Sequence, residues 1–216
     1  MQEALELLEI LGEFRPVMGG EDTIKWWPSA DGCFSVSSCY SLLRDRQLEE
    51  VVEAHTMEAI NRTWDTAVPS KIKVFGWRFF LNRLPSKDQL ERRNIINRVE
   101  DKLCVFCSVV NEDLAHMGFL CFFAAKVWDR VAVWLNIRAS VWMKKNQIGI
   151  IWLATVWSLW NTRNNFIFNN CDIVLDEVVV GIKMVSWIWV SVGATNRVFF
   201  PFYSWLQAPL VALKNL

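Results

Sequence analysis

Three cysteines and a histidine near the middle of the chain have the spacing of metal ligands. They read Cys104-x2-Cys107-x8-His116-x4-Cys121. A Cys-x2-Cys turn can present two thiolates to one ion, and His116 and Cys121 can complete a tetrahedron if the chain turns between them. Zinc prefers such ligands, at about 2.3 Å for sulfur and about 2.0 Å for nitrogen. Four protein ligands leave no position for water, so we predict a structural zinc site.

The segment from Cys104 to Cys121 is too short to form a hydrophobic core of its own, and too short and too rich in cysteine to be expected to form a regular element. We therefore expect the metal to order it, because zinc binding to short sites contributes roughly 10–16 kcal/mol, enough to offset the lost conformational entropy. Loss of one ligand should release the segment. The alternative is a chance grouping of reduced thiols and an imidazole.

No other group of residues points to catalysis. Polymerase chemistry needs paired aspartates that hold two metal ions, and the chain contains no Asp-Asp pair. It has two histidines, and one of them is assigned to zinc. No nucleophile is paired with a base. We expect the chain not to be an enzyme.

Charge is unevenly distributed along the chain, although the net charge is zero. Residues 1–60 hold twelve acidic and four basic side chains, a balance of −8, whereas residues 70–102 hold nine basic and four acidic ones, a balance of +5. Such a basic stretch is either a solvated helix face or a site for an anionic partner. With 53% apolar residues, the chain can also bury a core.

The N-terminal residues do not resemble a secretory signal, because glutamates replace the expected basic start and apolar run. We therefore expect an intracellular protein, in the nucleus or the cytoplasm, where cysteines favour metal or free thiols over disulfides. The apolar stretches 148–160 and 178–194 are too short or too diluted by polar residues to span a bilayer. A membrane is not an expected partner.

Helical periodicity dominates the chain, so we predict a mainly α fold: a helical domain with a small N-terminal β-hairpin and a zinc-stapled knuckle loop. A short helix is expected over 3–11. The Asp31-Gly32 turn between two short apolar runs predicts the hairpin, and Ser37 is expected to cap the helix that follows. Residues 49–60 are expected to be loosely ordered.

Further along, the chain predicts a helix with a wide, largely buried face, formed by Ile72, Phe75 and Phe79 on one side and by Val74, Trp77 and Leu81 on the next. Ser86 and Gln89 predict a capping box at the start of the next helix. Apolar residues at helical spacing predict a helix over 124–135. Two further apolar helices should follow, and then an irregular tail through Pro201 and Pro209.

Four motifs, in order, resemble the reverse-transcriptase zinc-binding domain of plant LINE-type (non-LTR) retrotransposon polyproteins. They are Trp27…Asp31-Gly32-Cys33-Phe34-Ser35-Val36-Ser37-Ser38-Cys39-Tyr40, Trp64…Pro69-Ser70-Lys71-Ile72-Lys73-Val74-Phe75-Gly76-Trp77-Arg78, Asn82-Arg83-Leu84-Pro85-Ser86-Lys87-Asp88-Gln89-Leu90, and the cysteine–histidine spacing followed by Phe123-Ala124…Val127-Trp128. Later pieces, Trp157…Trp160-Asn161-Thr162-Arg163-Asn164 and Trp205 to Leu213, also fit. The chain departs from the family pattern at Gly76 and Phe122.

The resemblance implies that the same cysteines and histidine bind zinc, and that the family's enzymes lie upstream, outside this sequence. It implies a detached tail of a retroelement or a relic reading frame. We expect three regions: an N-terminal helical flank (1–22), the zinc-binding domain (23–136) and an apolar helical extension (137–216).

Two functions remain open. The first is binding of RNA or single-stranded DNA, with Phe106 or Phe119 stacking on bases and basic side chains neutralising phosphates. These basic residues are Lys71, Lys73, Arg78, Arg83, Lys87, Arg92, Arg93 and Arg98. The second is a structural or protein-interaction module that uses the tryptophans and the apolar C-terminal helices.

Overall fold

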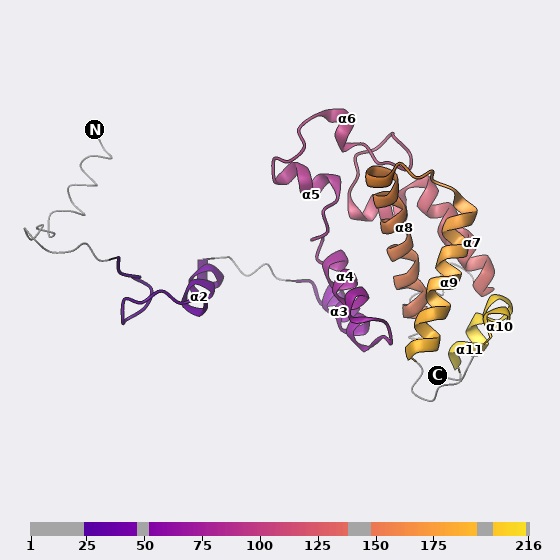
Figure 1. Cartoon of the computed structure of the whole chain (residues 1–216), viewed down its shortest axis with the longest axis horizontal. Coiled ribbons are helices and arrows are strands. Elements are labelled where there is room, and N and C mark those ends of the chain that lie inside the picture. Colours follow the sequence, from indigo (N-terminus) through magenta and orange to yellow (C-terminus); the bar gives the residue numbers. More distant parts are fainter. Residues whose placement is uncertain (1–23, 47–51, 138–147, 194–200, 215–216) are drawn as a thin grey trace, which may run out of the picture. The chain divides into compact units, whose positions relative to one another are not determined.

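The computed structural model describes residues 24–46, 52–137, 148–193 and 201–214. They are mainly helical, as predicted, and form two compact units, Met1–Val51 and Val52–Leu216. The first unit contains α2 (Val36–Arg46); the predicted helix over 3–11 lies outside the described residues. The second unit contains, in order, α3 (Ala54–Asp65), α4 (Ser70–Phe80), α5 (Lys87–Arg92), α6 (Val99–Lys102), η1 (His116–Leu120), α7 (Phe122–Leu135), α8 (Gly149–Asn169), α9 (Leu175–Gly193), α10 (Phe202–Gln207) and α11 (Pro209–Lys214), labelled in Figure 1.

The predicted N-terminal β-hairpin is wrong, since the described part of the chain contains no strand. The turn itself forms: Asp31 Oδ1 accepts a hydrogen bond from the Cys33 amide at 2.9 Å, and Gly32 has a φ of +67°. One backbone bond, from the Trp26 amide to the Gly32 carbonyl at 2.8 Å, closes it. The chain then enters α2 at Val36, before a ladder of strand bonds can develop.

The first amides of α2 are capped by a different serine from the one predicted. The Ser38 amide donates to Ser35 Oγ at 3.1 Å, which is the contact of an N-cap residue with the third helical position. Ser37 lies inside the helix. The prediction was two residues late because several serines compete for one cap.

Helix α3 contradicts the expectation of loose order over 49–60 for the residues that are described. It starts at Ala54, and its residues Ile60 and Thr63 are buried against α4. Glu58 and Arg62 form an ion pair one turn apart at 2.6 Å on its exposed side. An acidic stretch with apolar residues at helical spacing can thus be helical when a neighbouring helix covers the apolar side.

The predicted buried side of α4 is confirmed for Ile72, Phe75 and Phe79. The predicted width of that face is wrong, because Val74 and Trp77 are 42% and 38% exposed. Helix α4 therefore lies on the surface of the unit, with one face buried.

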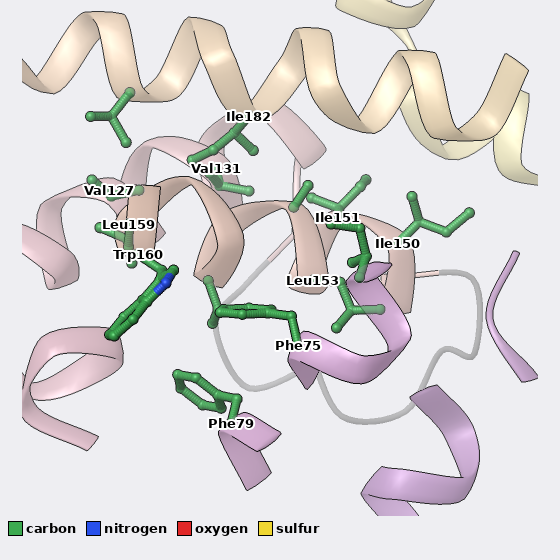
Figure 2. Packing of buried hydrophobic residues seen from close by; sticks show 14 of the residues in the cluster. Phe75, Phe79, Val127, Val131, Ile150, Ile151, Leu153, Leu159, Trp160 and Ile182 are labelled. Atoms are coloured by element: carbon green, nitrogen blue, oxygen red, sulfur yellow. The ribbon is translucent and has the colours of Figure 1, made fainter. Parts of the chain in front are cut away.

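Helix α8 is the centre of the second unit and packs against α4, α7, α9 and η1. Most of its residues from Ile150 to Trp160 are buried, so it is apolar on nearly every side. Figure 2 shows Phe75 and Phe79 of α4 on one side of it and Ile182 of α9 on the other. The two predicted apolar helices are thus α8 and α9. Among the described helices, none has both the length and the apolar character needed to cross a bilayer.

The predicted irregular tail is wrong, because residues 202–214 form the short helices α10 and α11. Pro201 precedes the first of them and Pro209 begins the second, positions where a missing amide costs nothing. Trp205 is fully buried, and its indole N–H donates to the Lys183 carbonyl at 3.0 Å. The indole of Trp134 donates to the Leu206 carbonyl at 3.0 Å. These bonds attach the tail to α7 and α9.

Gly76 allows α3, α4 and α8 to meet closely. A Cβ atom at this position would lie 2.8 Å from Thr63 Cγ2 and 2.9 Å from Leu153 Cδ2, distances that require a neighbour to move. Both neighbours are buried, so neither can move freely. The departure from the family pattern at Gly76 therefore has a packing role in this chain.

We expect Gly76→Ala to lower the free energy of unfolding by about 1 kcal/mol. Overpacking destabilises by about 1–3 kcal/mol, and the higher helix propensity of alanine offsets about 1 kcal/mol of that loss. Gly181 in α9 is the matched control, since no atom lies within 4 Å of a Cβ built there. Gly181→Ala should stabilise by about 0.5–1 kcal/mol. Urea unfolding of both variants measures the difference, and equal stabilisation would contradict the close packing.

Candidate metal centre

The four predicted metal ligands come together in the structure. One ligand atom from each of Cys104, Cys107, His116 and Cys121 lies within 4.8 Å of the others. The two sulfurs of Cys104 and Cys121 are 3.9 Å apart, and Cys107 Sγ is 3.4 Å from His116 Nε2. A tetrahedron around zinc has edges of about 1.6 bond lengths, hence about 3.8 Å between sulfurs and about 3.5 Å between sulfur and nitrogen. The cluster therefore fits a tetrahedral ion.

Local backbone structure brings the first two ligands together. A bridge between Leu103 and Asn111 closes the knuckle. Inside it, the Ser108 amide donates to the Cys104 carbonyl at 2.8 Å, and Ser108 has a φ of +54°. The chain therefore reverses directly after Cys107, which leaves both thiols on the inner side of the turn.

A π-helical turn, η1, brings the other two ligands together. The Cys121 amide donates to the His116 carbonyl at 2.7 Å, which is the i→i+5 bond of a π-helix. Five residues make up roughly one turn of this helix, so His116 and Cys121 face the same side. The expectation of no regular element between 104 and 121 was wrong at this point, because an α-helical pattern does not describe a spacing of five.

The ligands differ in burial and in thiol acidity. Cys104 and Cys121 are fully buried, His116 is 9% exposed, and Cys107 is half-buried. Burial raises the pKa of the Cys104 thiol to about 12. Burial also raises the pKa of Cys107, but hydrogen bonds from the Val110 and Val109 amides, together with His116, outweigh it and lower that pKa to about 6. A metal that binds thiolates therefore displaces a proton from Cys104 at neutral pH.

We call the segment 104–121, which carries the four ligands, the metal loop. Glu112 lies inside this loop and connects it to two other parts of the unit. Its carboxylate is fully buried, and Oε1 accepts hydrogen bonds from Arg163 Nη2 at 2.7 Å and Arg163 Nε at 3.0 Å. The same oxygen accepts the Lys87 amide at 3.1 Å, and the Glu112 carbonyl accepts the Asp88 amide at 3.1 Å. Helices α5 and α8 are thus both bonded to one residue of the loop.

Sequence reasoning missed the pairing of Glu112 with Arg163, although it quoted Arg163 as part of a family motif. A signal was present: an arginine inside a long apolar helix, and an acid inside a short metal loop, are both costly to bury unless they are paired. The residues that pair them lie 51 positions apart, so the pairing itself was not predictable from local spacing.

The predicted capping box at α5 is wrong. Ser86 precedes the helix but makes no capping bond, and its hydroxyl donates to Asp88 Oδ1 at 2.5 Å. Gln89 Nε2 donates to the same carboxylate at 3.1 Å. The first two amides of α5 bond to Glu112 instead, so a residue of the metal loop replaces the local cap.

Three of the predicted phosphate-binding residues hold the backbone of their own chain. Lys73 Nζ donates to the Trp64 carbonyl at 2.5 Å and Lys87 Nζ to the Leu103 carbonyl at 2.7 Å. Arg78 Nη2 donates to the Arg83 carbonyl at 3.0 Å. The eight basic residues therefore do not act as one uniform surface.

The remaining basic residues are exposed: Lys71, Arg83, Arg92, Arg93 and Arg98. Arg92 ends α5, and Arg93 follows it directly. The Lys102–Glu91 ion pair at 2.5 Å ties α5 to α6, directly before Cys104. Among the predicted basic residues that are exposed, Arg92, Arg93 and Arg98 are thus the closest in the chain to the metal loop.

The two phenylalanines expected to stack on bases have aromatic neighbours in the protein. Phe106 stacks on Phe123 with ring centroids 4.9 Å apart. Phe119 stacks on Trp128 at 5.7 Å and on Trp152 at 6.0 Å. These contacts make both rings part of the packing around the metal loop.

Comparison with known proteins agrees with this geometry. Residues 34–128 match the family model described as zinc-binding in reverse transcriptase. A curated protein of Arabidopsis thaliana named "Putative ribonuclease H protein" is 28% identical over 115 residues, which are 53% of this chain and 18% of that protein. No solved structure shows a significant match.

Residues 34–128 are thus similar to the zinc-binding region of reverse transcriptases, and the three cysteines and the histidine suit the metal that this family binds. The resemblance found in the sequence is confirmed. The chain spans less than a fifth of its curated relative. The match ends in α7, whereas Arg163, which neutralises the buried carboxylate of the metal loop, lies beyond it in α8.

We expect Arg163→Met to lower the free energy of unfolding by about 3–5 kcal/mol, because it leaves the buried Glu112 carboxylate without its counter-ion. Arg130→Met is the matched control, since Arg130 pairs with Asp176 at 3.5 Å on the surface and such pairs contribute at most about 1 kcal/mol. Denaturant unfolding of the zinc-loaded proteins gives both values. Similar losses in the two variants would show that the buried pair is not a special constraint.

Proposed function

We propose that this chain is a non-catalytic zinc-binding module, derived from a retrotransposon reverse transcriptase, that binds RNA or single-stranded DNA. In this proposal Cys104, Cys107, His116 and Cys121 hold one structural zinc ion. The observation that carries the proposal is the convergence of their four ligand atoms within 4.8 Å in a region matched by a zinc-binding family.

The ligand set supports a structural ion. When bound, zinc cross-links three thiolates and one imidazole and keeps no open position for a substrate or water. The cross-link joins the knuckle after α6 to the turn before α7. The ion thereby adds a cross-link to a segment that is too short to form a core alone and whose Leu114 and Met117 are buried in the core of the unit.

The basic side chains beside the metal loop support the nucleic-acid role. Arg92 and Arg93 are exposed at the end of α5, and Arg98 is exposed in the link to α6. The start of α5 bonds to Glu112 of the metal loop. Zinc would therefore fix the position of these cations, which can neutralise phosphates of a single strand.

Our proposal assigns no enzymatic activity to this chain on the basis of the name of the Arabidopsis protein. Its described ribonuclease H character belongs to a protein more than five times as long as the matched segment, which covers 18% of it. The sequence offers neither an Asp-Asp pair nor a nucleophile–base pair. We therefore place polymerase and nuclease chemistry in other parts of such polyproteins.

An exposed apolar stripe on α9 favours a second candidate function, a protein-interaction module. Val180, Met184, Ile188 and Val192 recur every four residues, so they share one side of the helix. All four are exposed, and the last is 79% exposed. Contiguous exposed apolar surface is a mark of interfaces.

Purified protein should contain one zinc ion per chain, measured by elemental analysis before and after a chelator. Cys121→Ser should abolish stoichiometric zinc and open the segment 104–121 to limited proteolysis, because a lost ligand removes the cross-link. Cys171→Ser, which changes an exposed thiol outside the cluster, should keep both zinc and protection. Full zinc content in Cys121→Ser would refute the ligand assignment.

Binding of a fluorescent 12-nucleotide single-stranded RNA, measured at several salt concentrations, tests the nucleic-acid role. Arg92→Gln/Arg93→Gln should weaken binding and reduce the salt slope by about 1.4, since each lost phosphate contact on a single strand removes about 0.7. Lys126→Gln/Arg130→Gln removes the same charge from the exposed side of α7 and is the control. If the affinity for RNA changes neither with salt concentration nor with the α5 substitutions, the protein-interaction module is favoured instead.

A further inference from the structure

A pocket of about 370 Å³ lies between α4 and α8, apart from the metal cluster. Lys71 and Arg78 of α4 line it, together with Trp157, Trp160 and Asn164 of α8 and the link through Pro85. Its volume falls in the usual range for small-ligand sites, about 300–1,000 Å³. The α8 wall lies beyond the region matched by the zinc-binding family, which ends at residue 128.

The aromatic wall of this pocket is held rigidly. Trp157 is half-buried and packs edge-to-face on Phe75, with ring centroids 5.0 Å apart and an angle of 83°. Trp160 is only 7% exposed and also lies against Phe75, at 6.4 Å. Figure 2 shows Trp160 and Phe75 turned toward the same space between the two helices. A ring held in this way loses little conformational entropy when a ligand stacks on it.

The charge of the pocket is positive. Lys71 Nζ lies 5.9 Å from the centroid of the Trp157 ring. Arg78 donates a hydrogen bond from Nη2 to the Arg83 carbonyl. The pocket lining includes no acidic side chain. A flat apolar body that carries a negative charge suits such a site.

A second pocket, of about 340 Å³ between α8 and α9, gives a contrast. Asp172 and Glu177 line it together with neutral polar residues, so a phosphate would be repelled there. The two pockets are similar in size but opposite in charge. The pocket beside α4 is therefore the one that fits a nucleotide.

We propose that the pocket between α4 and α8 binds one unpaired nucleotide of a single strand, with its base against Trp157 and a phosphate near Lys71 and Arg78. This inference rests on the proposed nucleic-acid function and adds a base-binding position to the phosphate contacts of the arginines after α5. Stacking of this kind tolerates any base, because every base has a π-face.

The test compares two 12-residue oligomers with the same phosphates, oligo-uridine and an abasic oligomer. The unchanged protein should bind oligo-uridine roughly fivefold or more tightly than the abasic oligomer, the range expected for one stacked base. Trp157→Leu should remove this preference, and Trp157→Phe should restore most of it. Zinc content and thermal unfolding check that each variant is folded.

Lys71→Gln provides a variant that spares the core, because Lys71 is exposed. It should reduce the salt slope for both oligomers by about 0.7. Lys126→Gln is its matched control, since Lys126 is also exposed and stacks over an aromatic ring, that of Phe122, at 4.3 Å on α7. Photo-cross-linking of an oligomer with 4-thiouridine should label the peptide that contains Trp157.

The outcomes separate this inference from the proposed function. Salt-dependent binding with no preference for bases, no difference between Lys71→Gln and Lys126→Gln, and cross-links elsewhere would overturn the pocket but leave nucleic-acid binding in place. Absence of salt-dependent binding to either oligomer would overturn both. If Trp157→Leu does not fold, the lysine pair and the cross-link still decide.

Discussion

The buried ion pair between Glu112 and Arg163 is the constraint on which the arrangement of the second unit depends. Both side chains are almost completely removed from solvent, so neither charge can be tolerated without the other. Glu112 belongs to the metal loop, Arg163 to the central helix α8, and the same carboxylate accepts an amide at the start of α5. A helix start, a metal loop and the core are thereby held by one residue. The metal loop therefore cannot shift without exposing or unpairing a charge.

The zinc site and the hydrophobic core meet in one assembly. The core is built around α8, whose sides are covered by α4, α7 and α9, and Leu114 and Met117 of the segment 104–121 are buried in the same core beside the ligands. Contacts such as Glu112–Arg163 and Trp134–Leu206 join residues on the two sides of position 136. The segment 104–121 and the helices after it consequently belong to one packed unit, Val52–Leu216, even though the family match ends at residue 128. The proposed division into 1–22, 23–136 and 137–216 stays a prediction, with strong packing across its second boundary.

The same assembly accounts for how a structural ion could serve a binding function. The start of α5 is bonded to the loop through Glu112 and its end presents Arg92 and Arg93. Lys71, at the pocket between α4 and α8, lies over a tryptophan of the helix that carries Arg163. Both groups of cations are therefore positioned by elements that meet at the loop. In this view the zinc ion acts on nucleic acid only indirectly, by fixing the surfaces around it.

Sequence alone predicted the grouping of the three cysteines and the histidine, the helical class and the buried side of α4, because these depend on spacing along a local segment. Cys104 to Cys121 are close in the chain, and the buried side of α4 follows from a repeat of 3.6 residues. Tertiary structure decided the features that join distant segments. Glu112, instead of Ser86, caps the start of α5. Leu153 packs so closely on Gly76 that a Cβ atom would not fit there. Helix α2 begins before a hairpin can form. A local pattern states which face of an element is apolar, whereas the partner of a buried charge, or the atom that meets a glycine, exists only after the chain has folded.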